Sequence, residues 1–260
     1  MNEKLEILIP EIFDKKKIRA GIIKRNINFN PPYGFSVTPS DFLSLEDAII
    51  NRKFLAKQLG CKNEKGNEIK KHFKFQKQVH STEVVEMFPE SDSFDYLTQE
   101  VHDGMFTSFR DIFLCVTIAD CCAILIHDPI KNIVSAIHSG WRGTIQNITK
   151  NGINKLIEKY KSKPPDLKVY LSPAASGRCF EVGWDVAKYF PESIIQINRD
   201  KYLFDNRAEI RRQLLDLGVT QENIESSDIC TISNSDYHSY RRDKDKSGRM
   251  VAFISMIPEE

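Results

Sequence analysis

Apolar residues recur at helical spacing in three parts of the chain. The first, residues 44–60, opens with Ser44, a favourable N-cap residue, and closes with Gly60, a common residue just beyond a helix end. The second, residues 144–160, begins with a threonine that can cap it and carries an apolar face. The third, residues 208–217, is followed by a glycine. This pattern predicts three helices.

Short apolar or alternating runs predict the strands. Phe73 and Phe75 alternate with polar neighbours, as in a half-exposed strand. The longest apolar stretch, 112–126, is interrupted by Asp120 and is shorter than the roughly 20 residues that span a bilayer, so it predicts a pair of buried strands. Helices and strands alternate without a regular rhythm, which favours a layered α+β sandwich with mixed β-sheets, formed as a single domain by residues 1–260. The buried strands are predicted at 113–117, 123–126, 133–137, 168–171 and 250–256.

Composition and charge narrow the class of protein. With 260 residues, 41% of them hydrophobic, the chain can build one large core. Its 37 Lys and Arg residues nearly balance 36 Asp and Glu residues, so no overall field favours nucleic acid or an anionic membrane as a partner. The first residues lack the hydrophobic segment of a secretion signal. The six cysteines form no short-range disulfide framework, which predicts reduced thiols and a cytoplasmic location; they are Cys61, Cys115, Cys121, Cys122, Cys179 and Cys230.

Three separated residues are the candidates for a catalytic metal site. His80, Cys121 and His138 each lie beside a predicted strand end, and two imidazoles with one thiolate are enough to hold zinc while leaving a fourth position open. Their spacing shows no local metal-binding motif, so the site depends on their meeting in the fold. The alternative is that both histidines are hydrogen-bonded residues at strand ends.

The neighbours of Cys121 add two further candidates. Asp120 interrupts an apolar stretch, and a carboxylate there must be paired, metal-linked or functional. Cys121 and Cys122 would point to opposite faces of an extended chain, so only one of them can readily face the site. The sequence alone leaves that choice open.

Four arginines are candidates for binding an anion. Arg142 lies in the segment Gly140-Trp141-Arg142-Gly143, just before a predicted helix start, where free backbone N–H groups favour anions. This segment can equally be a tight corner. Arg178, Arg241 and Arg242 lie in polar loops, where solvated surface charge is the alternative to substrate contact.

Taken in chain order, several segments resemble the YfiH-type family, also known as the laccase-domain, multicopper polyphenol oxidase or peptidoglycan editing factor family. The resemblance covers residues 72–256 and is weak over the first 70 residues. Departures are Ser172 and Ser176, where a glycine is common, and the absence of a recognisable N-terminal Arg-x-Gly-Gly segment. The matching segments are Gln78-Val79-His80, Asp103-Gly104, 117–121, 138–143, 172–183, 203–205, Cys230-Thr231 and 240–243.

The resemblance implies a layered α/β/β/α sandwich in which His80, Cys121 and His138 are the metal and active-site residues. It also implies that zinc is the usual metal and that Cys121, not Cys122, is the ligand. Members have been assigned purine nucleoside phosphorylase, methylthioadenosine phosphorylase and adenosine deaminase activities, and some are implicated in editing cell-wall precursors. Four coppers cannot be held by six histidines without a His-x-His pair, so laccase chemistry is disfavoured, although copper remains an alternative to zinc in the triad.

The leading hypothesis is a zinc enzyme acting on purine nucleosides. Zinc can activate water for deamination, whereas phosphorolysis needs a positioned phosphate, for which Arg142 and one of the other three arginines are candidates. Asp120 would manage protons. The alternatives are amide hydrolysis of a muropeptide precursor, with Cys121 as zinc ligand or nucleophile, and a non-catalytic protein in which the metal only staples the fold.

Overall fold

The computed structural model of the chain describes residues 4–60 and 72–259. Cys61 lies outside the described residues.

The larger of two facing β-sheets carries most of the later part of the chain. It is a six-stranded mixed sheet, in which the outer pairs β13–β9 and β4–β5 are parallel and the inner pairs are antiparallel. In order across the sheet, its strands are β13 (Ile224–Ser226), β9 (Lys168–Leu171), β7 (Cys122–Asp128), β8 (Ile133–Ser139), β5 (Gly104–Thr107) and β4 (Val84–Glu86).

The second sheet joins both ends of the chain. It is five-stranded and antiparallel except for its last pair, so the C-terminal strand lies between an N-terminal strand and a central one. Its strands are, in order, β1 (Ile7–Leu8), β2 (Ile18–Ile23), β14 (Met250–Met256), β6 (Phe113–Ile118) and β3 (Phe73–Lys74).

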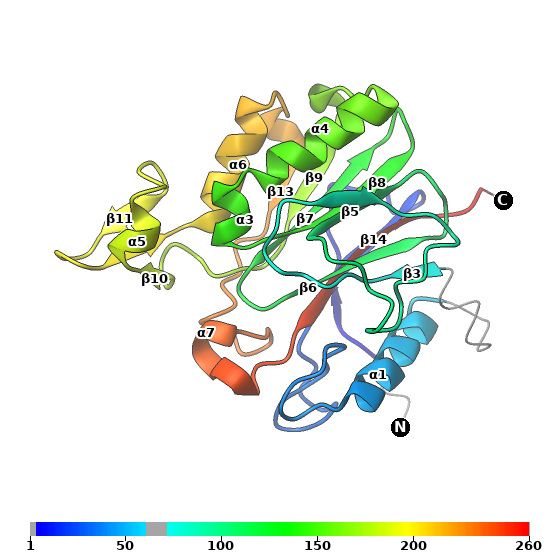
Figure 1. Cartoon of the computed structure of the whole chain (residues 1–260), viewed down its shortest axis with the longest axis horizontal. Coiled ribbons are helices and arrows are strands. Elements are labelled where there is room, and N and C mark those ends of the chain that lie inside the picture. The colour runs from blue at the N-terminus through cyan, green and yellow to red at the C-terminus, as the bar shows by residue number, and fades with distance from the viewer. Residues whose placement is uncertain (1–3, 61–71, 260) are drawn as a thin grey trace.

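Helices cover the outer faces of the two sheets, as Figure 1 shows. One helix packs on the five-stranded sheet, and two long helices pack on the six-stranded sheet, so the layers follow the order α/β/β/α. This order confirms the predicted sandwich. The helices are α1 (Leu45–Gln58) on the five-stranded sheet and α3 (Trp141–Ile145), α4 (Ile148–Tyr160) and α6 (Asn206–Asp216) on the six-stranded sheet.

Strand alternation divides the interior into distinct cores. In β7, Ala123 and Leu125 point toward the facing sheet, whereas Ile124 and Ile126 point toward α4 and α6. Such alternation is what a strand with both faces buried requires. The same rule will fix which way the side chains at the strand ends point.

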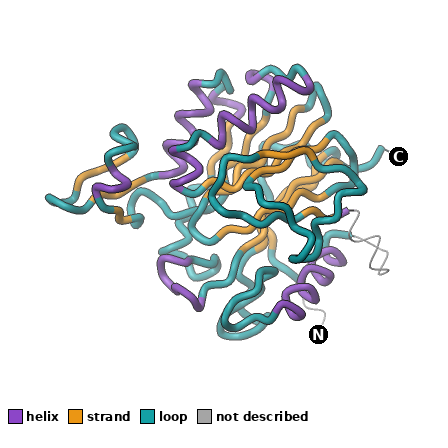
Figure 2. The backbone as a smooth tube through the Cα atoms, in the orientation of Figure 1, coloured by secondary structure: helices purple, strands orange, loops and turns teal. Residues whose placement is uncertain are grey.

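A small lobe projects from the sandwich beside α6, as the tube in Figure 2 shows. Its three-stranded sheet has the order β10–β12–β11 and packs on its own apolar cluster together with Trp141. The lobe comprises β10 (Glu181–Val182), α5 (Trp184–Ala187), β11 (Ile194–Gln196) and β12 (Tyr202–Phe204). The last helix before the C-terminal strand is α7 (Tyr240–Asp243), and 3₁₀ turns lie at Pro164–Asp166, Gln221–Asn223 and Lys244–Lys246.

Helix α1 has both predicted ends, whereas α6 ends as predicted but begins earlier than residue 208, at Asn206 with Asp205 as its N-cap. Helix α1 is capped by the Ser44 hydroxyl, which accepts the N–H of Asp47 at 3.1 Å. Both Gly60 and Gly218 adopt the left-handed backbone that favours glycine just after a helix.

The predicted helix start at Thr144 is wrong. The turn before it is already helical as α3, and its Thr144 hydroxyl bonds back to the Gly140 carbonyl at 3.1 Å instead of capping a following turn. Asn147 then adopts a left-handed conformation (φ 62°), which separates α3 from α4. The helical pattern was correct, but the break within it was not visible.

The predicted buried strand pair within 112–126 is also corrected. Strands β6 and β7 are both buried, but they belong to different sheets and do not pair. Asp120 lies in the connection between them with φ 80°. The described helices include none that is long and apolar enough to cross a membrane.

We expect Leu125→Ala to destabilise the protein by about 2–5 kcal/mol, because it opens a cavity between the two sheets. Leu125 is fully buried, whereas Leu97 is 92% exposed and provides a matched control. Leu97→Ala should change the free energy of unfolding by no more than about 0.5 kcal/mol. Urea unfolding of both variants measures the difference, and equal losses would contradict the proposed core.

Candidate functional site

The structure brings His80, Cys121 and His138 together. His80 lies in the loop between β3 and β4, Cys121 in the turn between β6 and β7, and His138 in β8. One ligand atom from each lies within 4.8 Å of the others, and the two imidazole centroids are 4.9 Å apart. No other group of three or more His, Cys, Asp or Glu side chains with this geometry occurs among the described residues.

Strand register explains why Cys121 and not Cys122 faces this cluster. Cys122 is the first residue of β7, and its fully buried side chain packs in the core under the helices. Burial raises the pKa of the Cys122 thiol to about 12, which leaves it protonated. Cys121, one residue earlier, is half-buried beside the two histidines.

Asp103 is hydrogen-bonded both to the loop that carries His80 and to His138. Its carboxylate is fully buried and accepts five hydrogen bonds. Four come from the His80 loop: the backbone N–H groups of Val79, His80 and Ser81 and the Ser81 hydroxyl. The fifth comes from His138 Nδ1 at 2.8 Å. One side chain therefore fixes the position of both histidines.

The backbone adds a second link between Asp103 and His138. The His138 N–H donates to the Asp103 carbonyl at 2.7 Å, as β5 begins beside β8. With Nδ1 bonded to the carboxylate, the other ring nitrogen of His138 is available on the Cys121 side. A carboxylate behind a histidine is the usual arrangement around a protein-bound metal, because it fixes the ring and raises its basicity.

The charges of the cluster support one another. Burial alone would lower the pKa of His138, but its interactions with the Cys121 sulfur and the Asp103 carboxylate raise it to about 9. Burial would likewise raise the pKa of Asp103, but its bonds to His138 and Ser81 bring it to about 2. Without a metal, the site therefore holds a proton on His138 that a metal ion would replace.

His80 is held in a strained conformation. Its φ is 61°, a left-handed value that is uncommon for a residue with a side chain. The loop is anchored on its other side by Gln78, whose side-chain amide donates to the Thr117 carbonyl at 2.7 Å and accepts the Thr117 N–H at 2.7 Å. Burial and the neighbouring His138 lower the pKa of His80, which favours the neutral, ligating form.

The residues present fit a metal ion. His80 Nδ1 is buried and has no hydrogen-bond partner among the described residues, which is costly unless something binds it. Gly140 leaves the space beside it open, because a Cβ there would lie 2.7 Å from His80 Nδ1 and 2.9 Å from Cys121 Sγ. Two imidazoles and one thiolate suit zinc, and they suit copper less distinctively.

Both carboxylate oxygens of Asp120 accept hydrogen bonds from neighbouring loops. One carboxylate oxygen accepts the Thr231 hydroxyl at 2.6 Å, and the other accepts the Arg241 backbone N–H at 2.6 Å. Its carbonyl accepts the N–H of Ala175 at 2.9 Å. Asp120 therefore joins three loops next to Cys121, and it forms no salt bridge with any residue that the structure describes.

The predicted arginines are divided among different places. Arg142 is exposed, with its guanidinium 4.4 Å from the Trp141 ring centroid, and its charge acts on His80. Arg241 lies 4.9 Å from the Phe180 ring centroid and lines the same cavity as Trp141. Arg178 lines another cavity.

Arg242 is a correction to the prediction of anion binding. Its guanidinium donates to several backbone carbonyls of its own loop and pairs with Asp243 at 2.8 Å. These bonds stabilise the loop before the C-terminal strand. They occupy the Arg242 guanidinium, so it does not point outward to bind an anion. A pattern of adjacent arginines could not reveal which one turns inward.

Asp103 and Arg249 are residues whose place the sequence did not predict. Arg249 is electrostatically coupled to Cys121 and Asp120, and its guanidinium donates to the carbonyls of Ser247 and Gly248. A sequence signal for Asp103 was present. It is a carboxylate directly before a glycine and an apolar run, and such a carboxylate needs a partner, as was argued for Asp120. Its partners, however, come from loops far away in sequence.

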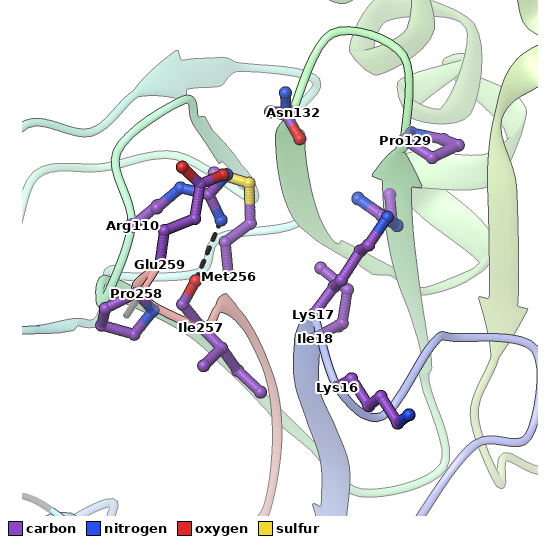
Figure 3. Close-up of a pocket in the computed structure, with 11 residues that line it drawn as sticks. Lys16, Lys17, Ile18, Arg110, Pro129, Asn132, Met256, Ile257, Pro258 and Glu259 are labelled. Atoms are coloured by element: carbon purple, nitrogen blue, oxygen red, sulfur yellow. Dashed lines mark hydrogen bonds and ion pairs between the residues drawn. The ribbon is translucent and has the colours of Figure 1, made fainter.

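Two cavities are lined by the aromatic and arginine side chains described above. One, of about 390 Å³, is lined by Trp141, Phe180, Lys201 and Arg241 among others, and a smaller one of about 190 Å³ is lined by Tyr240 and Arg249. A third cavity, drawn in Figure 3, lies where β7 ends and β8 begins, at the opposite strand ends from the triad. This cavity is therefore not part of the site formed by the triad.

The chain matches known proteins over most of its length. A family model described as multi-copper polyphenol oxidoreductase laccase matches residues 45–257. A purine nucleoside phosphorylase named YlmD, from Bacillus subtilis, is 35% identical over 162 residues, covering 59% of this chain and 58% of that protein. A purine nucleoside phosphorylase of Staphylococcus epidermidis is 31% identical over 189 residues, covering 68% and 70%. The chain spans less than two thirds of the length of the Bacillus subtilis relative.

Solved structures share the fold. A Bacillus licheniformis hypothetical protein named YfiH superposes with a TM-score of 0.86 at 25% identity, covering 96% of both chains. YlmD from Geobacillus stearothermophilus superposes with a TM-score of 0.87 at 23% identity, covering 99% of this chain and 98% of that one.

We expect Gly140→Ala to weaken zinc binding about tenfold or more while the protein stays folded. The added methyl group would press on His80 and Cys121, whereas the backbone of Gly140 (φ −83°) accepts an alanine. Competition with a chromogenic chelator measures the affinity. Gly143→Ala is the control, because its Cβ would meet only Ile148 at 3.3 Å and Ser81 at 3.6 Å within close range. Equal zinc affinity in the two variants would contradict the close packing at Gly140.

Asp103→Asn should weaken zinc binding by about 10- to 100-fold and also lower stability. Both carboxylate oxygens accept hydrogen bonds, so either placement of the amide points an NH₂ at N–H donors. Zinc competition and urea unfolding measure the two effects. The exposed Asp236→Asn is the control, and it should change neither; wild-type zinc affinity in Asp103→Asn would argue against the role of this carboxylate.

Proposed function

The chain belongs to this laccase-domain family, and we propose that it is a metal-dependent purine nucleoside phosphorylase with its active centre at His80, Cys121 and His138. The observation that carries the proposal is the convergence of the three side chains around a buried His80 nitrogen that has no hydrogen-bond partner in the described part of the chain. The names of the relatives support the substrate class.

Zinc is the proposed metal, held by His80, Cys121 and His138. When bound, it would supply Lewis-acid character at a position left open to substrate. Asp103 keeps the His138 ring in the ligating tautomer by accepting its Nδ1 proton in a hydrogen bond. Asp120 holds the Cys121 turn in position through its bonds to Thr231 and Arg241.

The side chains around the triad suit a nucleoside and a phosphate. The half-buried Trp141 and Phe180 offer aromatic faces against which a purine can stack, and Arg142 and Arg241 lie over these rings with permanently charged guanidinium groups. The cavity that Trp141, Phe180 and Arg241 share, about 390 Å³, is within the range that small-molecule ligands occupy. We assign the purine to this cavity and the phosphate to the two arginines.

The reaction we propose is displacement of the base by phosphate. Arg142 and Arg241 would orient the phosphate toward the sugar carbon that carries the base and neutralise its charge. Holding the phosphate beside the nucleoside replaces a collision in solution by an encounter within the site, which is a large part of the acceleration that such enzymes achieve.

The description of the family as multi-copper oxidases does not suit this chain. All six histidines lie in the described part of the chain, and only His80 and His138 lie in the cluster. The others lie elsewhere: His72 contacts Asp111, His102 bonds Gln76, His238 bonds the Phe35 carbonyl, and His127 lines the cavity between the end of β7 and the start of β8. A multicopper oxidase needs several histidine-rich sites.

We expect Cys121→Ala to reduce kcat/KM for phosphorolysis of adenosine or inosine by at least about a hundredfold, equivalent to about 2.7 kcal/mol of transition-state stabilisation. Cys122→Ala is the matched control, because the neighbouring thiol faces the helix-side core and should leave turnover near the wild-type value. Chromatography of each nucleoside, incubated with and without phosphate, measures the products.

The same assay separates the alternatives. Phosphorolysis releases the free base only when phosphate is present, whereas deamination converts adenosine to inosine without it. Chelation should abolish turnover and added zinc should restore it. Full activity in Cys121→Ala, or in the chelated protein, would overturn the proposed centre.

A further inference from the structure

A second pair of cysteines lies in a cavity outside the metal cluster. The cavity has a volume of about 590 Å³, and Cys179 and Cys230 are both among its lining residues. Both are partly exposed, unlike Cys115 and Cys122, which are fully buried. The proposed function uses neither of them.

Ser176 joins the two cysteines, although they lie far apart in the sequence. Its N–H donates to the Cys230 sulfur at 3.5 Å, and its carbonyl accepts the Cys179 N–H at 2.9 Å. The loop of Cys230 is anchored by a β-bridge to Ala174 and by the Thr231 N–H, which donates to the Ala174 carbonyl at 3.1 Å. This anchoring places Cys230 beside the loop that carries Cys179.

The environment of Cys230 is built for a thiolate. Its sulfur accepts the Ser176 N–H at 3.5 Å, and donors on Ser176 and Ser233 favour its charged form. Burial would raise the pKa of Cys230, but these donors lower it to about 6. The thiolate is then the main form of Cys230 at pH 7, whereas it is only a few per cent of an ordinary cysteine.

The rest of the cavity is richer in cations than in anions. Arg178, Arg207 and Arg211 line it, against Asp205 and Asp228. Arg207 is nearly buried, and its guanidinium donates only to the carbonyls of Ser227 and Ile229 among the described residues. Such a lining favours a charge-separated reaction in which an anion departs.

We propose that Cys230 and Cys179 form a peroxide-sensitive dithiol, in which Cys230 is the attacking thiolate and Cys179 the resolving thiol that closes a disulfide. Cys230, one end of this disulfide, is followed directly in the sequence by Thr231. The Thr231 hydroxyl donates to Asp120, which is the neighbour of Cys121. This inference goes beyond the proposed nucleoside chemistry and does not depend on it.

The oxidant is hydrogen peroxide. The Cys230 thiolate attacks one peroxide oxygen, an S–O bond forms, the O–O bond breaks, and the departing hydroxide takes a proton to become water. The Cys179 sulfur, losing its proton, then attacks Cys230 Sγ; the S–S bond forms as the S–O bond breaks, and a second hydroxide leaves and is protonated. Two thiols are oxidised by two electrons, and one peroxide is reduced to two waters.

The first test uses the wild-type protein, so it does not depend on a variant folding. Brief exposure to iodoacetamide at pH 7, followed by peptide mass spectrometry, should label Cys230 at least about tenfold faster than Cys115 and Cys122. Treatment with hydrogen peroxide should then give a Cys179–Cys230 cross-linked peptide that a dithiol reductant separates. Zinc is kept in the buffer to protect Cys121 from labelling. The peptide that contains Cys121 is followed separately.

Two variants assign the roles. Cys179→Ser should stop the reaction at the Cys230 sulfenic acid, which dimedone traps, and Cys230→Ser should give neither the adduct nor the cross-link. Cys122→Ser is the matched control and should oxidise as the wild type does. Slow labelling of Cys230, or peroxide treatment that leaves both thiols free or links Cys179 to another cysteine, would overturn the proposal whether or not the protein cleaves nucleosides.

Discussion

The buried carboxylate of Asp103 is the interaction on which the site depends. An ionised carboxylate removed from water costs several kcal/mol unless it is fully hydrogen-bonded, and the sandwich meets this demand with five donors. Four of the donors belong to the loop that carries His80, so satisfying the charge also holds that histidine in its left-handed conformation. The fifth orients His138. A single charge thus makes the geometry of two residues from distant parts of the chain mutually dependent.

Strand alternation supplies the second constraint. Because successive side chains on β7 and β8 face opposite layers, His138 lies on the inter-sheet side with Ala123, while Cys122 faces the helices. The thiol that reaches the cluster must therefore come from the residue before the strand. In sequence, Cys121 and Cys122 could not be told apart without the family resemblance, whereas the burial of Cys122 separates them directly.

The sequence predicted the regular elements better than their connections. Helical spacing and the caps at Ser44 and Gly60 correctly identified α1, and apolar runs identified β6, β7, β8, β9 and β14. The break at Asn147 and the passage of the chain between sheets at Asp120 depend on left-handed single residues, which periodicity does not reveal. The partners of Arg242 and Asp103 depend on contacts between loops. Local patterns thus indicated which residues carry chemistry, and tertiary structure decided which of them are free to use it.

The cysteines make this dependence plain, because one residue type occupies several environments in one molecule. Cys115 and Cys122 lie in apolar cores, where the loss of water outweighs the neighbouring donors and charges, so burial raises the pKa of each thiol. Cys230 is also partly withdrawn from water, yet hydrogen bonds from two serines reverse the effect of burial on its pKa. Cys121 instead meets two imidazoles, one of which is held by a carboxylate. Burial therefore does not decide whether a thiol is inert; the donors and charges that the fold brings to the sulfur decide it, and those come from loops that no sequence window contains together.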